Sequence, residues 1–191
     1  TAEAFTLEVD VAESSGESED NWTKAWSNGG PYGHSDIGST EFNTLFQESE
    51  SYIIKRYCHN CSGTTHDEIY YKRISNPTAF EPYSYMINTW SSNNNVLNAH
   101  FELYSTMEDL EAGTNKWSYC NYDDGGIGFP RDCGPDGAYP FMWNSISSGS
   151  TRTVDYYIHT PVSVSAVVDF NDYVFDEDGD DLSISTMPPS S

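Results

Sequence analysis

Apolar and polar residues alternate strictly at the start of the chain. Within residues 1–13, Phe5, Leu7, Val9 and Val11 occupy every second position, and most residues between them are polar or acidic. A period of two places these four side chains on one face of an extended segment. The pattern therefore predicts an amphipathic strand.

The next seven residues separate this strand from the rest of the chain. Residues 14–20 are serine-rich and acidic, and they contain Gly16. This composition is typical of a flexible joint rather than a tight hairpin. We expect a detached N-terminal strand, followed by a single domain over residues 21–191 with an acidic C-terminal segment.

Most of that domain shows the pattern of short strands. Segments enriched in β-branched and aromatic residues are separated by clusters of Gly, Asn, Ser and Pro. They predict strands at 52–57, 68–74, 83–90, 96–104, 116–122, 154–159 and 162–168. One or two helical turns are expected from Ser105 to Gly113, because Ser105 and Glu108 have capping-box spacing and glycine ends helices. The pattern predicts an all-β fold, a two-sheet β-sandwich of jelly-roll or immunoglobulin-like type.

The charge balance limits the partners of this domain. Thirty Asp and Glu oppose eight Lys and Arg, and the formal net charge is -22. Such a surface repels nucleic acid and anionic membranes, so we expect no nucleic-acid partner and no membrane insertion. The chain starts at Thr1 and has no long apolar run, which favours the mature form of an exported protein. An aromatic content of 15% predicts that it folds.

Four cysteines form an even set, Cys58, Cys61, Cys120 and Cys133. They allow two disulfides in three connectivities, of which we favour the local pairing Cys58–Cys61 and Cys120–Cys133. A zinc site using these thiolates and the nearby His66 is the alternative. Disulfides are preferred, because the other features indicate an oxidising compartment and the second pair lacks the short spacing of a zinc knuckle.

Two N-glycosylation sequons support export. Asn21 begins the triplet Asn-Trp-Thr, and Asn60 begins the triplet Asn-Cys-Ser. Both lie in polar, turn-rich sequence where a glycan would remain solvated. We expect a secreted protein with covalent glycans on both residues.

The acidic run at residues 176–181 holds five carboxylates around one glycine. Clustered carboxylates repel one another unless water or a hard cation such as Ca²⁺ neutralises them. Residues 175–185 resemble the cadherin-like signature F-x-D-x-D-G-D-x-L of extracellular surface proteins, most closely in its D-x-D-G-D-x-L part. The resemblance implies calcium binding by Asp176, Asp178 and Asp180, and a solvated acidic turn is the alternative. No other cofactor is required.

Aromatic residues offer a second type of binding surface. Five tryptophans lie among Asn, Gly and Tyr, as on surfaces where sugar rings stack in β-sandwich lectins: Trp22, Trp26, Trp90, Trp117 and Trp143. Core positions are the alternative for most of them. The five histidines are scattered, and no nucleophile-elbow motif accompanies them, so we expect that the chain is not an enzyme.

The order of amphipathic strand, joint and sandwich resembles the donor-strand arrangement of pilus-like filaments. In those filaments the terminal strand of one subunit completes the sheet of its neighbour. The resemblance implies a structural subunit of a secreted, glycosylated filament or surface layer, joined head to tail to copies of itself. The alternatives are that residues 1–13 fold back onto their own sheet, and that the chain is a carbohydrate-binding or adhesion module.

Overall fold

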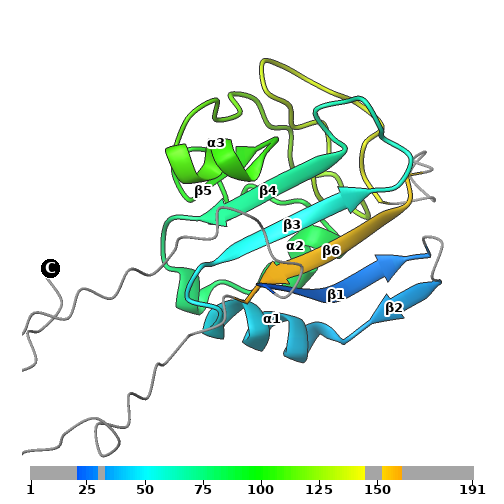
Figure 1. Ribbon diagram of the computed structural model, residues 1–191, viewed down its shortest axis with the longest axis vertical. Coiled ribbons are helices and arrows are strands. Elements are labelled where there is room, and N and C mark those ends of the chain that lie inside the picture. The colour runs from blue at the N-terminus through cyan, green and yellow to red at the C-terminus, as the bar shows by residue number, and fades with distance from the viewer. Residues whose placement is uncertain (1–20, 30–32, 145–151, 161–191) are drawn as a thin grey trace, which may run out of the picture.

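The computed structural model describes residues 21–29, 33–144 and 152–160, which surround one antiparallel sheet (Figure 1). Its order is β2-β1-β6-β3-β4-β5. The strands are β1 Trp22–Asn28, β2 His34–Asp36, β3 Ile53–Cys58, β4 Glu68–Arg73, β5 Phe101–Tyr104 and β6 Val154–His159. The helices are α1 Ser39–Glu48, α2 Pro82–Ile87, α3 Met107–Ala112 and the 3-10 turn η2 Pro77–Ala79. The sheet joins distant parts of the chain, because β6 lies between β1 and β3.

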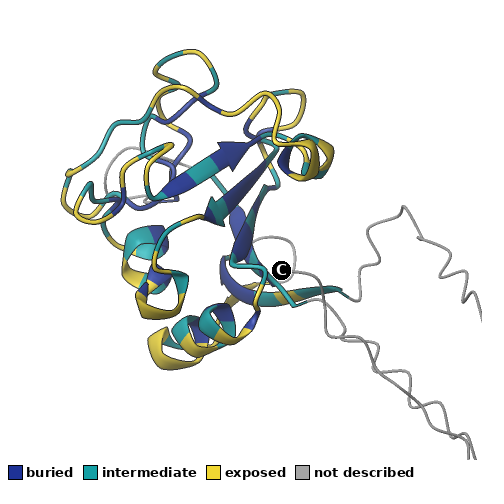
Figure 2. Cartoon of the chain, turned by 90° about the vertical axis from the view of Figure 1, so that its left-hand side faces the viewer, coloured by how far each residue is buried: buried dark blue, intermediate teal, exposed yellow. Residues whose placement is uncertain are grey.

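Helices α1 and α2 and the loops of residues 114–144 cover one side of the sheet, called here the covered face. In β6, Val154, Tyr156 and Ile158 are buried on this face, as period-two alternation requires. Figure 2 shows that buried segments concentrate in the sheet, while the outward sides of the helices are exposed. The helices contribute Phe42, Phe46 and Met86 to the core.

Arg56 is a charged residue inside this core. It lies on β3 and is fully buried. Its Nη1 donates to the carbonyl oxygen of His66 at 3.1 Å, and its Nη2 donates to the carbonyl oxygen of Met142. Burial lowers its pKa to about 10, and nearby Tyr156 partly opposes that shift. The guanidinium thus remains charged at neutral pH and joins two loops to the sheet.

The described residues confirm a fold made mostly of strands, but they contain one sheet and not the two layers of a sandwich. Helices and loops, rather than a second sheet, pack against the covered face. Helix α1 was missed, although Phe42 and Phe46 have the i, i+4 spacing of a helix face. The strand predicted at 83–90 was wrong, since its segment contains α2. Pro82 supplies the fixed φ angle of a first helical turn, and this outweighs the β propensity of the tyrosines that follow.

Other predicted elements are shorter than expected. Only Phe101–Tyr104 of the segment 96–104 is a strand, and residues 116–122 contribute one isolated bridge, between Tyr119 and Gly134. The strands at 52–57, 68–74 and 154–159 are confirmed within one residue. The predicted helix is α3, and it ends at Gly113 with φ 65°. Its cap is Thr106 rather than Ser105.

The favoured disulfide pairing is confirmed. Cys58 pairs with Cys61, and Cys120 pairs with Cys133. The thiolate zinc alternative is therefore wrong, because all four sulfur atoms are bonded to one another in pairs. The strand at 1–13 with Phe5, Leu7, Val9 and Val11, the joint at 14–20, the strand at 162–168 and the acidic run at 176–181 lie outside the described residues.

Candidate functional site

The opposite side of the sheet, called here the open face, carries polar and aromatic side chains. In β6, Asp155, Tyr157 and His159 alternate with the buried core residues and so point to this side. Across the strands, Lys24 of β1 and Lys55 of β3 both lie opposite Tyr157. Helix α3 covers only the far part of this side, where Leu110 packs with Tyr70 and Tyr104.

A hollow of about 400 Å³ lies on the open face. Three aromatic rings, one ammonium group and one carboxylate line it: Trp22, Tyr57, Tyr157, Lys55 and Glu68. The Nζ atom of Lys55 lies 4.4 Å from the ring centroid of Trp22 and 5.6 Å from that of Tyr157. Among the described residues, Lys55 forms no ion pair. The hollow therefore offers a cation held over aromatic rings, next to a carboxylate.

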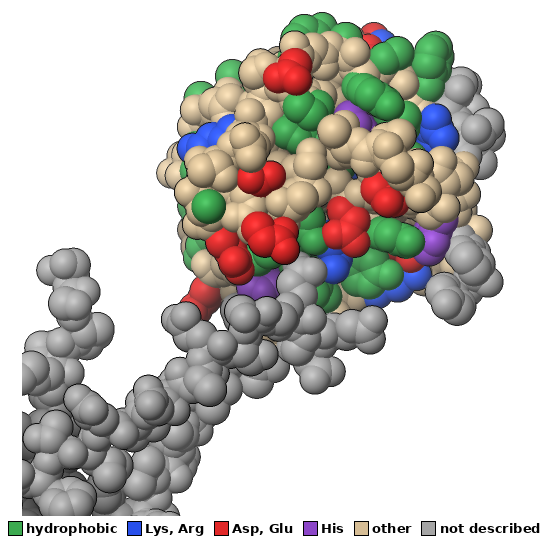
Figure 3. All heavy atoms as spheres, turned by 45° about the horizontal axis from the view of Figure 1, so that its top comes forward, with side chains coloured by type: hydrophobic (Ala, Val, Ile, Leu, Met, Phe, Trp, Pro, Cys, Tyr) green, Lys and Arg blue, Asp and Glu red, His purple; other side chains and the backbone are tan. Residues whose placement is uncertain are grey.

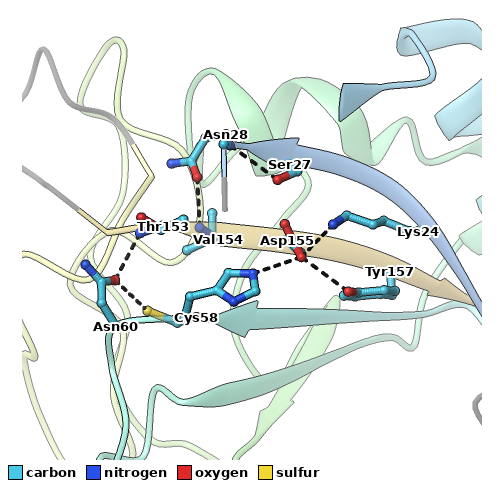
Figure 4. Close-up of polar contacts among 11 residues, drawn as sticks. Lys24, Ser27, Asn28, Cys58, Asn60, Thr153, Val154, Asp155 and Tyr157 are labelled. Carbon is cyan, nitrogen blue, oxygen red and sulfur yellow. Dashed lines mark hydrogen bonds and ion pairs between the residues drawn. The ribbon is translucent and has the colours of Figure 1, made fainter. Parts of the chain in front are cut away.

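Asp155 anchors the polar network beside the hollow (Figure 4). Its side chain is 1% exposed, and its Oδ2 atom accepts hydrogen bonds from Lys24 at 2.7 Å and from Tyr157 at 3.2 Å. His59 Nε2 lies 3.0 Å from the same oxygen. Burial opposes ionisation of Asp155, but hydrogen bonds from Lys24, Ser27 and His59 outweigh it and lower its pKa. The network fixes the position of the Tyr157 ring at the edge of the hollow.

His159 lies next to the hollow at the end of β6. Its ring centroid is 4.8 Å from that of Trp22. Burial, and to a lesser extent the charge of Lys55, lowers the pKa of His159. The imidazole is therefore neutral at neutral pH, so Lys55 is the cation of this part of the face.

The arrangement is suited to binding by stacking and hydrogen bonding. Within the described ranges, no group of three or more His, Cys, Asp and Glu lies together as metal ligands would. A second, more polar hollow of about 300 Å³ lies beyond Glu68, between β4 and α3. Glu68 lines both hollows, so the two form adjoining parts of one polar surface.

The predicted glycosylation sites lie near opposite ends of β6. The carbonyl oxygen of Asn21 accepts a hydrogen bond from the Thr160 amide, whereas the side chain of Asn60 accepts one from the Thr153 amide. Asn60 is exposed, and Asn21 is partly exposed. Glycosylation stays a prediction for both. Asp176, Asp178 and Asp180 lie outside the described residues, so calcium binding also stays a prediction.

Only one of the predicted sugar-stacking tryptophans lies at the hollow. Trp22 lines it, while the other four are buried: Trp26, Trp90, Trp117 and Trp143. The other four residues that line the hollow were not predicted as site residues: Lys55, Tyr57, Glu68 and Tyr157. The available signal was the alternation within β3, where Lys55 and Tyr57 alternate with Ile54 and Arg56.

The chain matches no protein-family model, no curated protein and no solved structure. Among the described residues, no helix is long and apolar enough to cross a membrane.

Proposed function

We propose that the chain is a structural subunit of a secreted, glycosylated filament or surface layer, in which residues 1–13 of one copy pair with the sheet of the next. The observation that carries the proposal is the edge strand β2. All three of its residues are exposed, and within the described part of the chain it pairs on one side only, with β1. An exposed edge is a template for an added strand.

The opposite edge of the sheet is less suited to strand addition. At β5, the Trp117 amide donates to the carbonyl oxygen of Leu103 at 2.9 Å, and the Asn98 amide donates to that of Phe101 at 2.7 Å. Lys116 also forms an ion pair with Glu102. Because other segments already use these groups of β5, β2 is the acceptor edge in our proposal.

Export of the subunit is supported by the two disulfides, which form and persist in oxidising compartments. The exposed position of Asn60 is compatible with a glycan. A net charge of -22 disfavours unspecific contact between copies, so assembly needs a specific joint. An amphipathic strand supplies such a joint through ladder hydrogen bonds and one apolar face.

Leu7→Asp should weaken assembly about 10- to 100-fold. The substitution removes the burial of one leucine, worth roughly 1.5–3 kcal/mol, and each 1.4 kcal/mol changes an equilibrium tenfold. Light scattering and electron microscopy of the purified chain measure the assembly. Near-ultraviolet circular dichroism should show that the sheet domain is still folded.

The matched control is Thr6→Asp, which places the same charge on the opposite face of the predicted strand. It should assemble nearly as the natural chain does. Equal behaviour of the two variants, or normal assembly after deletion of residues 1–13, would contradict strand exchange.

A second candidate function is carbohydrate binding or adhesion, and the aromatic hollow favours it. Sugar rings stack on aromatic faces, while Lys55 and Glu68 provide a donor and an acceptor for hydroxyl groups.

Because Trp22 lines the hollow, a bound sugar should change tryptophan fluorescence in a saturable titration with neutral oligosaccharides. Tyr57→Ala should reduce the affinity at least tenfold, whereas Tyr119→Ala, an exposed tyrosine that does not line the hollow, should not. A response that is the same in both variants would exclude the hollow as the sugar site.

A further inference from the structure

The basic residues of this chain are confined to its central part, which also holds sixteen of the thirty Asp and Glu. Residues 1–20 contain seven Asp and Glu, residues 161–191 contain seven more, and neither segment contains Lys or Arg. All eight basic residues therefore belong to the central part of the chain. The surface view in Figure 3 shows scattered acidic side chains and few basic ones.

The four lysines belong to one side of that central part. They are Lys24, Lys55, Lys72 and Lys116. Lys24, Lys55 and Lys72 lie on the open face, and Lys116 pairs with Glu102, which neighbours Lys72 across β4 and β5. We call the surface formed by these four lysines the lysine face; it is part of the open face.

Two of the four lysines have an ion-pair partner and two do not, although the charge of Lys72 contributes to lowering the pKa of Glu102. Lys24 pairs with Asp155, and Lys116 pairs with Glu102. Within the described residues, neither Lys55 nor Lys72 lies within ion-pair distance of a carboxylate. The ammonium group of Lys55 lies over aromatic rings, where it is only partly solvated and attracts a carboxylate more strongly than it would in bulk water.

The C-terminal segment starts close to this surface. The Thr160 amide donates to the carbonyl oxygen of Asn21, so the segment after residue 160 starts at the end of β1 and β6 that bears Trp22 and His159. From there to residue 176 a chain can span up to about 50 Å, at roughly 3.3 Å per residue. The two strand spacings from β6 to β4 amount to only about 10 Å. The acidic run can therefore reach Lys55 and Lys72 of its own copy.

The chemistry of the segment matches the hollow. Residues 176–181 concentrate five carboxylates in six positions, the densest run of negative charge in the chain. Aromatic residues immediately precede them, at Phe170, Tyr173 and Phe175. A segment that joins aromatic rings to carboxylates complements Trp22, Tyr157 and Lys55 of the hollow, although Glu68, which also lines it, opposes the approach of a carboxylate.

We propose that residues 170–181 dock on the lysine face of the same chain, with carboxylates at Lys55 and Lys72 and an aromatic ring in the hollow. This intramolecular contact is independent of the strand exchange through residues 1–13. It occupies the hollow and so competes with any sugar or second copy that would bind there.

Zero-length cross-linking of the full chain tests the contact. A carbodiimide joins a lysine ammonium and a carboxylate as an amide, and the water that is lost converts the carbodiimide to a urea. We expect Lys55 or Lys72 to be joined to residues 176–181 in mass-spectrometric maps recorded with a chelator present. The Lys116–Glu102 pair is the internal positive control. In about 1 M NaCl the new cross-links should decrease several-fold, because salt screens exposed charges.

Isotope mixing identifies the occupant. In an equal mixture of ordinary and ¹⁵N-labelled chains, the proposed cross-links join peptides of the same label only. Mixed-label cross-links would show a second copy on the lysine face and would overturn the intramolecular contact. Two further results would overturn the intramolecular contact. One is cross-links from Lys55 and Lys72 to residues 1–20, and the other is the absence of any cross-link from these lysines when the Lys116–Glu102 cross-link is found.

Matched variants complete the test. The triple variant Asp176→Asn, Asp178→Asn and Asp180→Asn should reduce the cross-links at Lys55 and Lys72 at least fivefold. The control variant Glu3→Gln, Glu8→Gln and Glu13→Gln removes three charges from the other acidic segment and should leave them unchanged. An equal reduction in both variants would point to net charge alone and contradict the docked segment.

Discussion

Arg56→Ala should lower the free energy of unfolding by about 3–5 kcal/mol. The substitution leaves two buried carbonyl oxygens, of His66 and Met142, without their donor, and each such loss costs roughly 1–3 kcal/mol. It also opens a cavity beside Tyr156 in the buried core. Urea denaturation monitored by circular dichroism measures the change.

Two comparisons identify the cause of this loss. Arg56→Met keeps most of the apolar volume but supplies no donor, so it should recover only part of the stability. Lys72→Ala, on the open face of the neighbouring strand, should change the stability by about 1 kcal/mol or less. A loss after Arg56→Ala that is no larger than after Lys72→Ala would show that the buried guanidinium does not hold the loops.

The strands that could be predicted are those enriched in β-branched and aromatic residues. Val154–His159 was found at its observed bounds, because β-branched and aromatic residues alternate there between core and open face. The covering layer could not be predicted in the same way. Helices α1 and α2 are short, and their propensities are weak, so burial of Phe42, Phe46 and Met86 against the sheet stabilises them. That contact is long-range and leaves little local signal.

The candidate site was predicted only in part. Trp22 was among the aromatic candidates. Lys55 and Glu68 lie on the consecutive, paired strands β3 and β4, but Tyr157 and Trp22 join them only because β6 inserts between β1 and β3. Residues more than one hundred positions apart thus share the hollow. Sequence spacing indicates which side chains share one face of a strand, but it does not give the order of the strands.

His66 should make the protein lose stability as the pH falls from about 6.5 towards 4. Its ring is fully buried and stacks on Tyr139, with 4.3 Å between the ring centroids. The Nε2 atom of His66 lies 2.9 Å from the carbonyl oxygen of Cys133. Burial lowers its pKa to about 4; the bond to Cys133 opposes this shift, and the charges of Arg56 and Arg152 add to it. In the unfolded chain, an ordinary histidine titrates near 6.5. The unfolded state therefore binds the proton first, and acid favours unfolding over this window.

The expected loss is about 3 kcal/mol across the whole window, since each unit of pKa difference corresponds to about 1.4 kcal/mol. The measurement compares urea unfolding of the natural chain and of His66→Gln at pH 7.5 and pH 4.5. The glutamine amide can still donate to the carbonyl oxygen of Cys133 but does not titrate. At pH 7.5 the variant should be the less stable protein, because it loses the ring contacts with Tyr139 and Trp117. Towards pH 4.5 the stability difference between the two proteins should shrink by roughly 2–3 kcal/mol, because only the natural chain loses the contribution of His66. Carboxylates such as Asp155 and the partly buried His159 titrate in both proteins, so their effects cancel in the comparison. Parallel pH profiles of the two proteins would mean that His66 has the same pKa in the folded and unfolded states. That result would contradict the effect of its burial between two aromatic rings.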